Sequence, residues 1–165
     1  MTTDELSIRA AAFTDQDAVW QTLEPTIRAG ETVALAPDMT RDTGLEFWFS
    51  ARHEVFVAEQ AGTVVGTYFL RANQAGGGAH VANSVYVVSP SATGRGIAQA
   101  MCEHSLNQAR ARGFLAMQFN FVVSSDERRL KLWQRAGFRI VGTLPKAFRH
   151  PALGLIDALV MYRDL

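Results

Sequence analysis

A turn with two glycines around an arginine lies between an apolar strand pattern and a helical pattern, in the segment PSATGRGIAQAM, residues 90–101. Glycine adopts positive φ angles without steric cost and lets a ligand approach the backbone. A helix N-terminus behind such a turn presents unpaired N–H groups to an anion. Gly94, Gly96 and Ala98 leave these donors uncovered, and Arg95 adds positive charge. An ordinary strand-to-helix turn competes with this reading, but the combination favours a phosphate-binding turn.

Two common phosphate-binding motifs do not match this turn. It lacks the Gly-Lys-Ser/Thr ending of a nucleotide triphosphatase loop. It also lacks the spacing of a dinucleotide fingerprint, and it lies in the middle of the chain instead of after a first strand. The sequence therefore predicts a diphosphate ligand of another kind.

Three amide side chains interrupt apolar strand patterns. Gln118 and Asn120 lie two residues apart in AMQFNFVV, so both should point to one face while Phe119 and Phe121 point to the other. Asn83 occupies a similar position in VANSVYVV. Burying an amide costs free energy unless it is hydrogen-bonded. These amides are either satisfied core groups or the polar lining of a ligand pocket.

Candidate general bases are scattered along the chain. They are Glu31, Glu59, His80 and Asp157, and each also has an ordinary structural explanation. The single cysteine, Cys102, falls inside a helical pattern, where a buried structural thiol is expected. The sequence does not select a base, and we expect neither a covalent enzyme intermediate nor a bound metal ion.

The elements that position these residues follow an α/β pattern. Hydrophobic periodicity and turn residues give the order β-α-α-β-β-β-α-β-α-β-β, which predicts a mixed sheet with helices on its faces. A hairpin is expected around Ala61-Gly62. The first helix should kink or restart at Pro25, and the second should be capped by Thr43. Strands are predicted at 6–12, 53–60, 63–72, 81–88, 114–123, 138–144 and 155–162.

Composition excludes several classes of protein. The 165 residues carry 16 basic and 16 acidic side chains, which argues against a dedicated nucleic-acid binder. No apolar segment reaches the ~20 residues of a membrane span, and MTTDELSIRAA lacks the pattern of a secretory signal. One cysteine cannot form an internal disulfide. We expect one domain, residues 1–165, in the cytoplasm.

Two motifs resemble the GCN5-related N-acetyltransferase (GNAT) family. Thr93-Gly-Arg-Gly-Ile-Ala98 resembles its coenzyme A pyrophosphate loop, with Thr93 replacing the usual Gln or Arg, and the strand before it ends Tyr86-Val-Val-Ser-Pro90. Leu132-Trp-Gln-Arg-Ala-Gly-Phe138 resembles a second family motif. The resemblance implies a mixed, mostly antiparallel sheet of six to seven strands, with acetyl-CoA as cofactor. The implied cofactor contacts are Tyr86, Val87, Val88, Thr93, Gly94, Arg95, Gly96, Ile97, Ala98, Asp126 and Trp133.

The same resemblance suggests catalytic roles. A backbone N–H near Val87, on a bulged strand, would stabilise the thioester oxygen. Trp133 stands where many members have a tyrosine that protonates the leaving thiolate, and tryptophan cannot deliver that proton. Asp126 replaces a usual asparagine, and an acidic residue in a first helical turn also has a purely structural explanation.

A narrower resemblance concerns the acceptor. Asn83 with Tyr86, and Asn120 with Phe121, resemble substrate-pocket positions of fungal acetyltransferases that act on proline analogues such as azetidine-2-carboxylate. Asn83 and Tyr86 would share a face only across a bulge. The resemblance implies direct acetyl transfer to a small amine, with amino acids and their analogues as one option and Asn120 as a catalytic residue.

Other functions remain open at this point. The same fold acetylates protein N-termini or lysines, which would require an open groove beside residues 30–40 and 145–153. A non-catalytic acyl-CoA sensor would account for tryptophan at position 133. A monomer and a homodimer are both compatible with the sequence.

Overall fold

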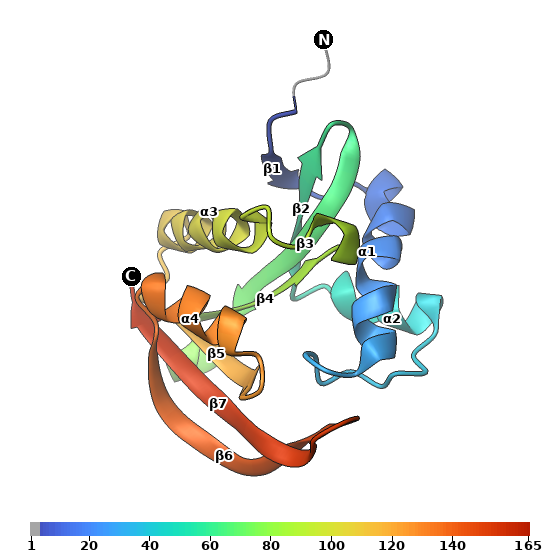
Figure 1. The fold of residues 1–165 in the computed structure, drawn as a ribbon. Coiled ribbons are helices and arrows are strands. Elements are labelled where there is room, and N and C mark those ends of the chain that lie inside the picture. Colours follow the sequence, from blue (N-terminus) through green and yellow to red (C-terminus); the bar gives the residue numbers. More distant parts are fainter. Residues whose placement is uncertain (1–3) are drawn as a thin grey trace.

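The computed structural model describes residues 4–165. Residues 1–3 lie outside the described residues, and they begin the segment that lacks the pattern of a secretory signal. Seven strands form one sheet in the order β1-β2-β3-β4-β5-β7-β6 (Figure 1). All neighbouring strands pair antiparallel except β4 and β5. The strands are β1 (Ser7–Ala10), β2 (Glu54–Gln60), β3 (Thr63–Ala72), β4 (Val81–Val88), β5 (Ala116–Val123), β6 (Arg139–His150) and β7 (Gly154–Asp164). The expected mixed, mostly antiparallel sheet is confirmed.

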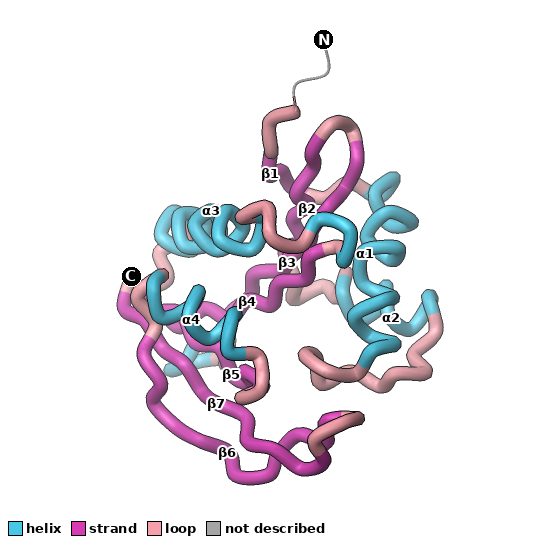
Figure 2. The backbone as a smooth tube through the Cα atoms, in the orientation of Figure 1, coloured by secondary structure: helices cyan, strands magenta, loops and turns pink. Residues whose placement is uncertain are grey.

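Four α-helices flank the sheet (Figure 2). They are α1 (Gln16–Ala29), α2 (Arg41–Trp48), α3 (Ile97–Ala111) and α4 (Glu127–Arg135). The chain also forms the 3₁₀ turns η1 (Phe13–Asp15), η2 (Gly76–Gly78) and η3 (Pro90–Ala92). The β2–β3 hairpin turns at Ala61 and Gly62, both with positive φ, as its sequence predicts.

Two hydrophobic clusters hold the helices on the sheet. The first includes Met101 and Leu106 of α3, Trp133 of α4 and Phe119 of β5. The second includes Leu23 and Ile27 of α1 and Trp48 of α2, packed against residues such as Phe69 of β3. The helices α1 and α2 therefore cover one face, and α3 and α4 the other.

The sheet divides between β4 and β5. These eight-residue strands pair over only three positions, from Val81↔Ala116 to Asn83↔Gln118. Beyond Asn83 the two strands diverge, and their facing edges lose their partners (Figure 1). A cleft follows from this split because the helices on both sides cannot fill it.

Two helices differ from what the sequence suggested. Helix α1 does not restart at Pro25 but continues through it, because buried Leu23 and Ile27 anchor it on both sides of the exposed proline. Helix α2 is capped by Thr40 instead of Thr43: the Thr40 hydroxyl accepts a hydrogen bond of 3.2 Å from the Thr43 N–H. Tertiary packing outweighs local propensity at Pro25, whereas the cap at Thr40 is a local hydrogen bond.

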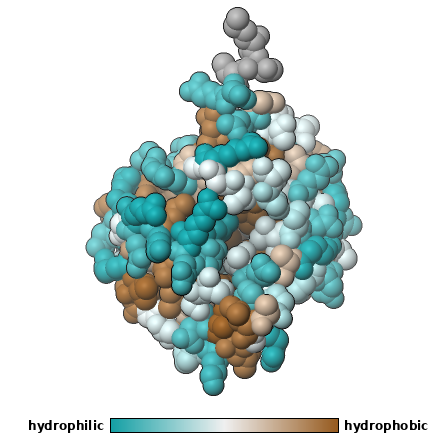
Figure 3. Space-filling model, viewed as in Figure 1, coloured by the Kyte–Doolittle hydropathy of each residue, from teal (hydrophilic) through white to brown (hydrophobic). Residues whose placement is uncertain are grey.

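The outer edge of the sheet is unusually apolar. The β6–β7 hairpin exposes Ile140, Val141, Leu144, Leu153 and Leu155, and hydrophobic patches lie over the lower part of the molecule in Figure 3, where Figure 1 places these strands. Within residues 4–165, no helix is both long and apolar enough to cross a membrane. The same residues contain no group of three or more His, Cys, Asp or Glu side chains placed to hold a metal ion.

Candidate active site

The cleft between β4 and β5 encloses about 220 Å³. Its walls come from α1, residues 32–35, α2, β3, β4, β5 and α4 with its N-cap. In Figure 3 the same face of the molecule is hollowed between the two helical layers. Seven residues singled out from the sequence line the cleft: Asn83, Tyr86, Val87, Asn120, Phe121, Asp126 and Trp133. The structure therefore brings together side chains from positions 83 to 133.

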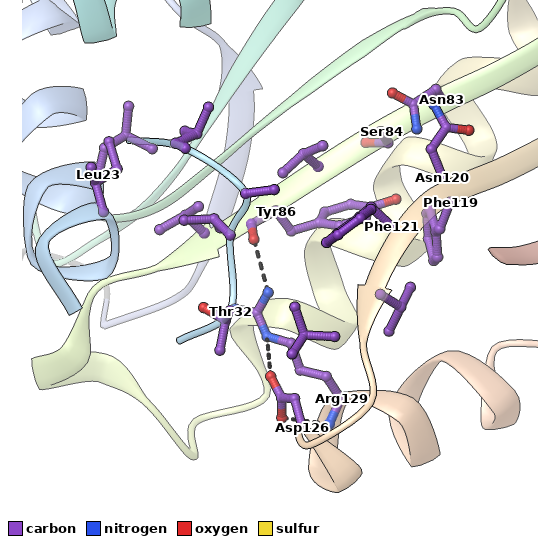
Figure 4. Close-up of a pocket in the computed structure, with 18 of the residues that line it drawn as sticks. Leu23, Thr32, Asn83, Ser84, Tyr86, Phe119, Asn120, Phe121, Asp126 and Arg129 are labelled. Atoms are coloured by element: carbon purple, nitrogen blue, oxygen red, sulfur yellow. Dashed lines mark hydrogen bonds and ion pairs between the residues drawn. The ribbon is translucent and has the colours of Figure 1, made fainter. Parts of the chain in front are cut away.

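The floor of the cleft carries a chain of amides. The Asn120 amide donates to Asn73 Oδ1 at 2.6 Å and accepts from Gln118 Nε2 at 2.9 Å. Asn83 Nδ2 donates to the Gln118 carbonyl oxygen at 2.9 Å. Asn83 and Asn120 lie together at one end of the close-up in Figure 4. Each amide is thus satisfied, and each is held in a fixed orientation.

Strand β5 bends where it enters the cleft. Its register with β7 shifts between Phe119 and Val122. Phe119 is buried and stacks on Phe138 at 4.1 Å between ring centroids, and Phe121 contacts Phe148. Both phenylalanines line the cleft. The simple alternation expected for AMQFNFVV ends at this irregularity, which places Asn120 and Phe121 in the same wall.

Strand β4 lacks the expected bulge. It pairs with β3 without a register shift from Ala82 to Val88. Asn83 therefore faces the α1–α2 side, whereas the Tyr86 side chain faces α3, where its hydroxyl lies 2.6 Å from Ser105 Oγ. The two residues line the cleft from opposite faces of one strand, so the expectation that they share a face is wrong.

The same register decides which peptide groups of β4 face the gap. The Ser89 N–H donates to the Val65 carbonyl, and the Val81 carbonyl accepts from the Asn73 N–H, both at 2.8 Å. Antiparallel pairing alternates, so the odd-numbered residues of β4 point their peptide groups at β3. The N–H of Val87 therefore faces β3, contrary to the expected role. The peptide groups of Tyr86 and Val88 face the gap.

A half-buried arginine occupies this gap. Arg129 Nη1 donates to the Tyr86 carbonyl oxygen at 3.0 Å, and Arg129 Nε lies 3.7 Å from Asp126 Oδ2 (Figure 4). Burial lowers the pKa of Arg129, but a guanidinium remains protonated at neutral pH. Asp126 also caps α4 by accepting the Arg129 backbone N–H at 3.2 Å. Arg129 is a functional candidate that the sequence motifs did not reveal.

Trp133 belongs to the wall of the cleft. Its side chain is buried and lies 5.1 Å from Tyr86 and 5.0 Å from Phe119, measured between ring centroids. This packing explains why a large apolar side chain stands at position 133.

The glycine turn lies between β4 and α3. Gly94 and Gly96 have φ values of 86° and 76°, which favour glycine. A Cβ atom at Gly96 would meet nothing within 4 Å. Helix α3 has no side-chain cap, so its first N–H groups remain available. This open, donor-rich turn fits an anionic ligand.

Two arginines approach this turn from different directions. Arg95 Nη2 donates to the Ser91 carbonyl oxygen at 3.1 Å and so is committed within the turn. Arg128, from α4, places Nη2 within 3.3 Å of the position a Cβ would take at Gly94. The sequence singles out Arg95, whereas the structure adds Arg128, which lies more than thirty residues away along the chain.

The four candidate bases lie outside the cleft lining. Glu59 pairs with Arg9 at 2.9 Å, and Asp157 accepts the Lys146 N–H at 2.9 Å. Glu31 and His80 are exposed. Among the described residues that line the cleft, Asp126 is the one carboxylate.

Comparisons with known proteins agree with this geometry. The Acetyltransferase (GNAT) family model matches residues 17–138. A GCN5-related N-acetyltransferase structure from Kribbella flavida is 38% identical, with a TM-score of 0.92 over 97% of this chain and 98% of that one. A structure of phosphinothricin acetyltransferase from Sinorhizobium meliloti with AcCoA is 18% identical, with a TM-score of 0.84 over 100% and 89% of the two chains, and shows a shared fold.

A curated relative also matches most of the sequence. N-acetyltransferase aca1 of Schizosaccharomyces pombe is 25% identical over 151 residues, which cover 81% of this chain and 72% of the relative. The family model alone covers well over half of the chain. Together with the divided sheet and the glycine turn, these matches show that the chain belongs to the acetyltransferase (GNAT) family.

Proposed function

We propose that this protein transfers the acetyl group of acetyl-CoA directly to the amine of a small molecule. As an N-acetyltransferase of the GNAT family, it takes its acetyl group from acetyl-CoA. The observation that supports a small acceptor is the cleft itself. About 220 Å³ is small beside the ~300–1,000 Å³ of typical ligand pockets, and residues 32–35 form part of its wall. A peptide chain passing through would need a longer open groove.

The glycine turn fits the pyrophosphate of coenzyme A. Its backbone from Thr93 to Ala98 offers donors at an uncapped helix end, with open space in front of Gly96. Arg128 adds charge beside Gly94. The gap-facing peptide groups of Tyr86 and Val88 are suited to hold the pantetheine arm. Bound acetyl-CoA supplies an activated acyl group as a thioester.

The oxyanion donor in this proposal is the N–H of Tyr86 instead of that of Val87. Tyr86 lines the cleft and directs its peptide groups into the gap, as its carbonyl bond to Arg129 indicates. A fixed backbone donor stabilises negative charge that develops on a carbonyl oxygen. The positive charge of Arg129 in the same cleft favours the developing thiolate, because Trp133 cannot donate a proton to it.

The acceptor amine would lie among Asn83, Asn120 and Phe121. Asparagine can both donate and accept hydrogen bonds, which suits a polar amine. Asp126 is engaged by Arg129 and by the α4 backbone, so it is poorly placed to act as a base. The amine therefore reacts after losing its proton to water.

A free-thiol assay with acetyl-CoA tests this function. The acceptors are amino acids, polyamines and short peptides with a free N-terminus or lysine. Burial raises the pKa of the Cys102 thiol to about 12, so the native protein should give no thiol background. Thiol release with small amines and little with peptides is expected. Release with peptides alone would favour protein acetylation, and tight acetyl-CoA binding without release for any amine would favour a sensor.

A further inference from the structure

Arg71 of β3 lines the cleft with a charge that no carboxylate neutralises. It is half-buried, and burial lowers its pKa. Within residues 4–165 its side chain has no ion pair and one hydrogen bond, from Nε to Asn83 Oδ1 at 3.0 Å. An unpaired charge in a partly buried position is costly. A charge on the cleft wall with no acidic partner is available to an anionic ligand.

The amide network fixes the direction of Arg71. Because Asn83 Nδ2 donates to the Gln118 carbonyl, its Oδ1 must face Arg71. The guanidinium also lies over the Phe69 ring, 5.6 Å from its centroid. Its Nε is therefore occupied and its plane is held, while both Nη groups remain available. In the described residues every buried side-chain N or O atom has a hydrogen-bond partner. The two Nη groups of Arg71 have no partner among these residues, so they are not buried and a ligand can reach them.

The charges that line the cleft also favour an anionic ligand. Its lining holds two arginines, Arg71 and Arg129, and one carboxylate, Asp126. Asp126 is paired with Arg129, which leaves Arg71 in excess. Arg52, outside the lining, lies close enough to lower the pKa of Arg71 further.

We infer that Arg71 binds the carboxylate of the acceptor, so that the substrate is an amine that also carries a carboxylate, of the amino-acid class. This inference rests on the proposed function and makes Arg71 its specificity-determining residue. The two Nη groups match the paired oxygens of a carboxylate. Asn83 acts as a positioning residue for Arg71, and Asn120 faces the same space from β5.

Matched acceptors test the contact. The probes are proline with prolinamide and methionine with methioninamide, compared by kcat/KM in the wild type and in Arg71→Gln. We expect the variant to lose about 10- to 100-fold with the acids, as for a hydrogen bond to a charged group, and to keep its activity with the amides. The acid-to-amide ratio is compared between proteins, which cancels the different basicities of the two amines. Arg71→Lys keeps the charge but lacks the paired N–H donors of the guanidinium. Its kcat/KM with the acids should therefore lie between those of the wild type and Arg71→Gln.

Arg52→Gln is the matched control, since it removes a nearby positive charge that does not line the cleft. An equal loss of kcat/KM with the acids in Arg71→Gln and Arg52→Gln would show that only the general positive charge matters. That result would overturn the contact between Arg71 and the carboxylate. An unchanged acid-to-amide ratio in Arg71→Gln, or thiol release with polyamines alone, would also overturn it while leaving the proposed function intact. No thiol release with any amine would instead overturn the proposed function.

A measurement on the wild type covers the case in which Arg71→Gln is unstable. Tetrahydrofuran-2-carboxylate has the shape of proline without its amine. It should inhibit competitively against the acceptor, and its carboxamide should not. Equal inhibition by the acid and the carboxamide would contradict a carboxylate site.

Discussion

The guanidinium of Arg129 donates a hydrogen bond of 3.0 Å to the carbonyl oxygen of Tyr86 across the gap in the sheet. This contact joins α4 to β4 at the place where β5 has turned away. It brings a half-buried positive charge beside the peptide groups proposed to hold the thioester.

Replacing Arg129 should therefore affect the chemical step. We expect Arg129→Gln to lower kcat by about 10- to 100-fold, because it removes a fixed charge near the departing sulfur. Arg129→Lys should retain more activity. Arg135→Gln is the control, an exposed residue at the end of the same helix. Steady-state kinetics with saturating acetyl-CoA make the comparison, and an unchanged kcat in Arg129→Gln would remove the residue from the mechanism.

The glycine turn can be tested with a matched pair of glycines. Gly96 and Gly113 have φ values of 76° and 81°, and a Cβ at either position would meet nothing within 4 Å. Both Trp variants therefore carry similar backbone strain, about 1–2 kcal/mol. Calorimetry should show that Gly96→Trp abolishes acetyl-CoA binding and that Gly113→Trp preserves it. Equal affinity in both variants would mean that the turn holds no pyrophosphate.

The two arginines near the turn should contribute unequally. Arg95 is committed to the Ser91 carbonyl, whereas Arg128 reaches Gly94 from α4. We expect Arg128→Gln to weaken acetyl-CoA binding more than Arg95→Gln, and the difference to shrink at high salt. Binding isotherms at two ionic strengths provide the test. A larger effect from Arg95 would favour the ranking suggested by the sequence alone.

Asn120 should matter for the acceptor more than for the fold. Removing its amide should lower kcat/KM for the amine by the equivalent of ~1–3 kcal/mol and leave the KM for acetyl-CoA unchanged. Asn73→Ala breaks the same 2.6 Å hydrogen bond from outside the cleft lining and serves as the control. If Asn120→Ala changed only the melting temperature, Asn120 would be a core amide.

Stability should fall on mild acidification. Burial lowers the pKa of both His53 and His104 below the ordinary value of 6.5, with nearby Arg71 and Arg112 acting in the same direction. The unfolded chain then binds more protons than the folded one as the pH falls through about 6.5, so the free energy of unfolding decreases. Melting temperatures between about pH 7.5 and 5.5 should show this.

His104→Gln isolates part of that effect, since glutamine can still bond to the Tyr68 hydroxyl that lies 2.7 Å from His104 Nδ1. Its melting temperature should depend less on pH than that of the wild type. A slope equal to that of the wild type would assign the acid sensitivity to other groups.

The sequence predicts the order of elements and the glycine turn well because both depend on local patterns, whereas the mostly antiparallel sheet is implied by the family resemblance. Periodicity locates the strands, and glycine at 94 and 96 reflects a local φ requirement. The register of β4 does not follow from a local pattern. The direction of the Val87 N–H depends on pairing with β3, so the family resemblance placed the oxyanion donor one residue away from the group that faces the gap.

The arginines show a second limit of sequence patterns. Arg71, Arg128 and Arg129 belong to no recognised motif, and arginines in strands and helices are ordinarily surface residues. Their roles arise from neighbours distant in sequence, such as Asn83 for Arg71 and Tyr86 for Arg129. Only the folded chain brings these partners together.

Acetyl transfer to a small amine can be tested by measuring both products of one reaction. Coenzyme A thiol is followed by absorbance, and the amine is analysed by mass spectrometry. We expect one acetylated amine for each thiol released by the wild type, and neither product with Gly96→Trp. Acetyl-CoA binding with no acetylated amine, for any member of the acceptor panel, would contradict it.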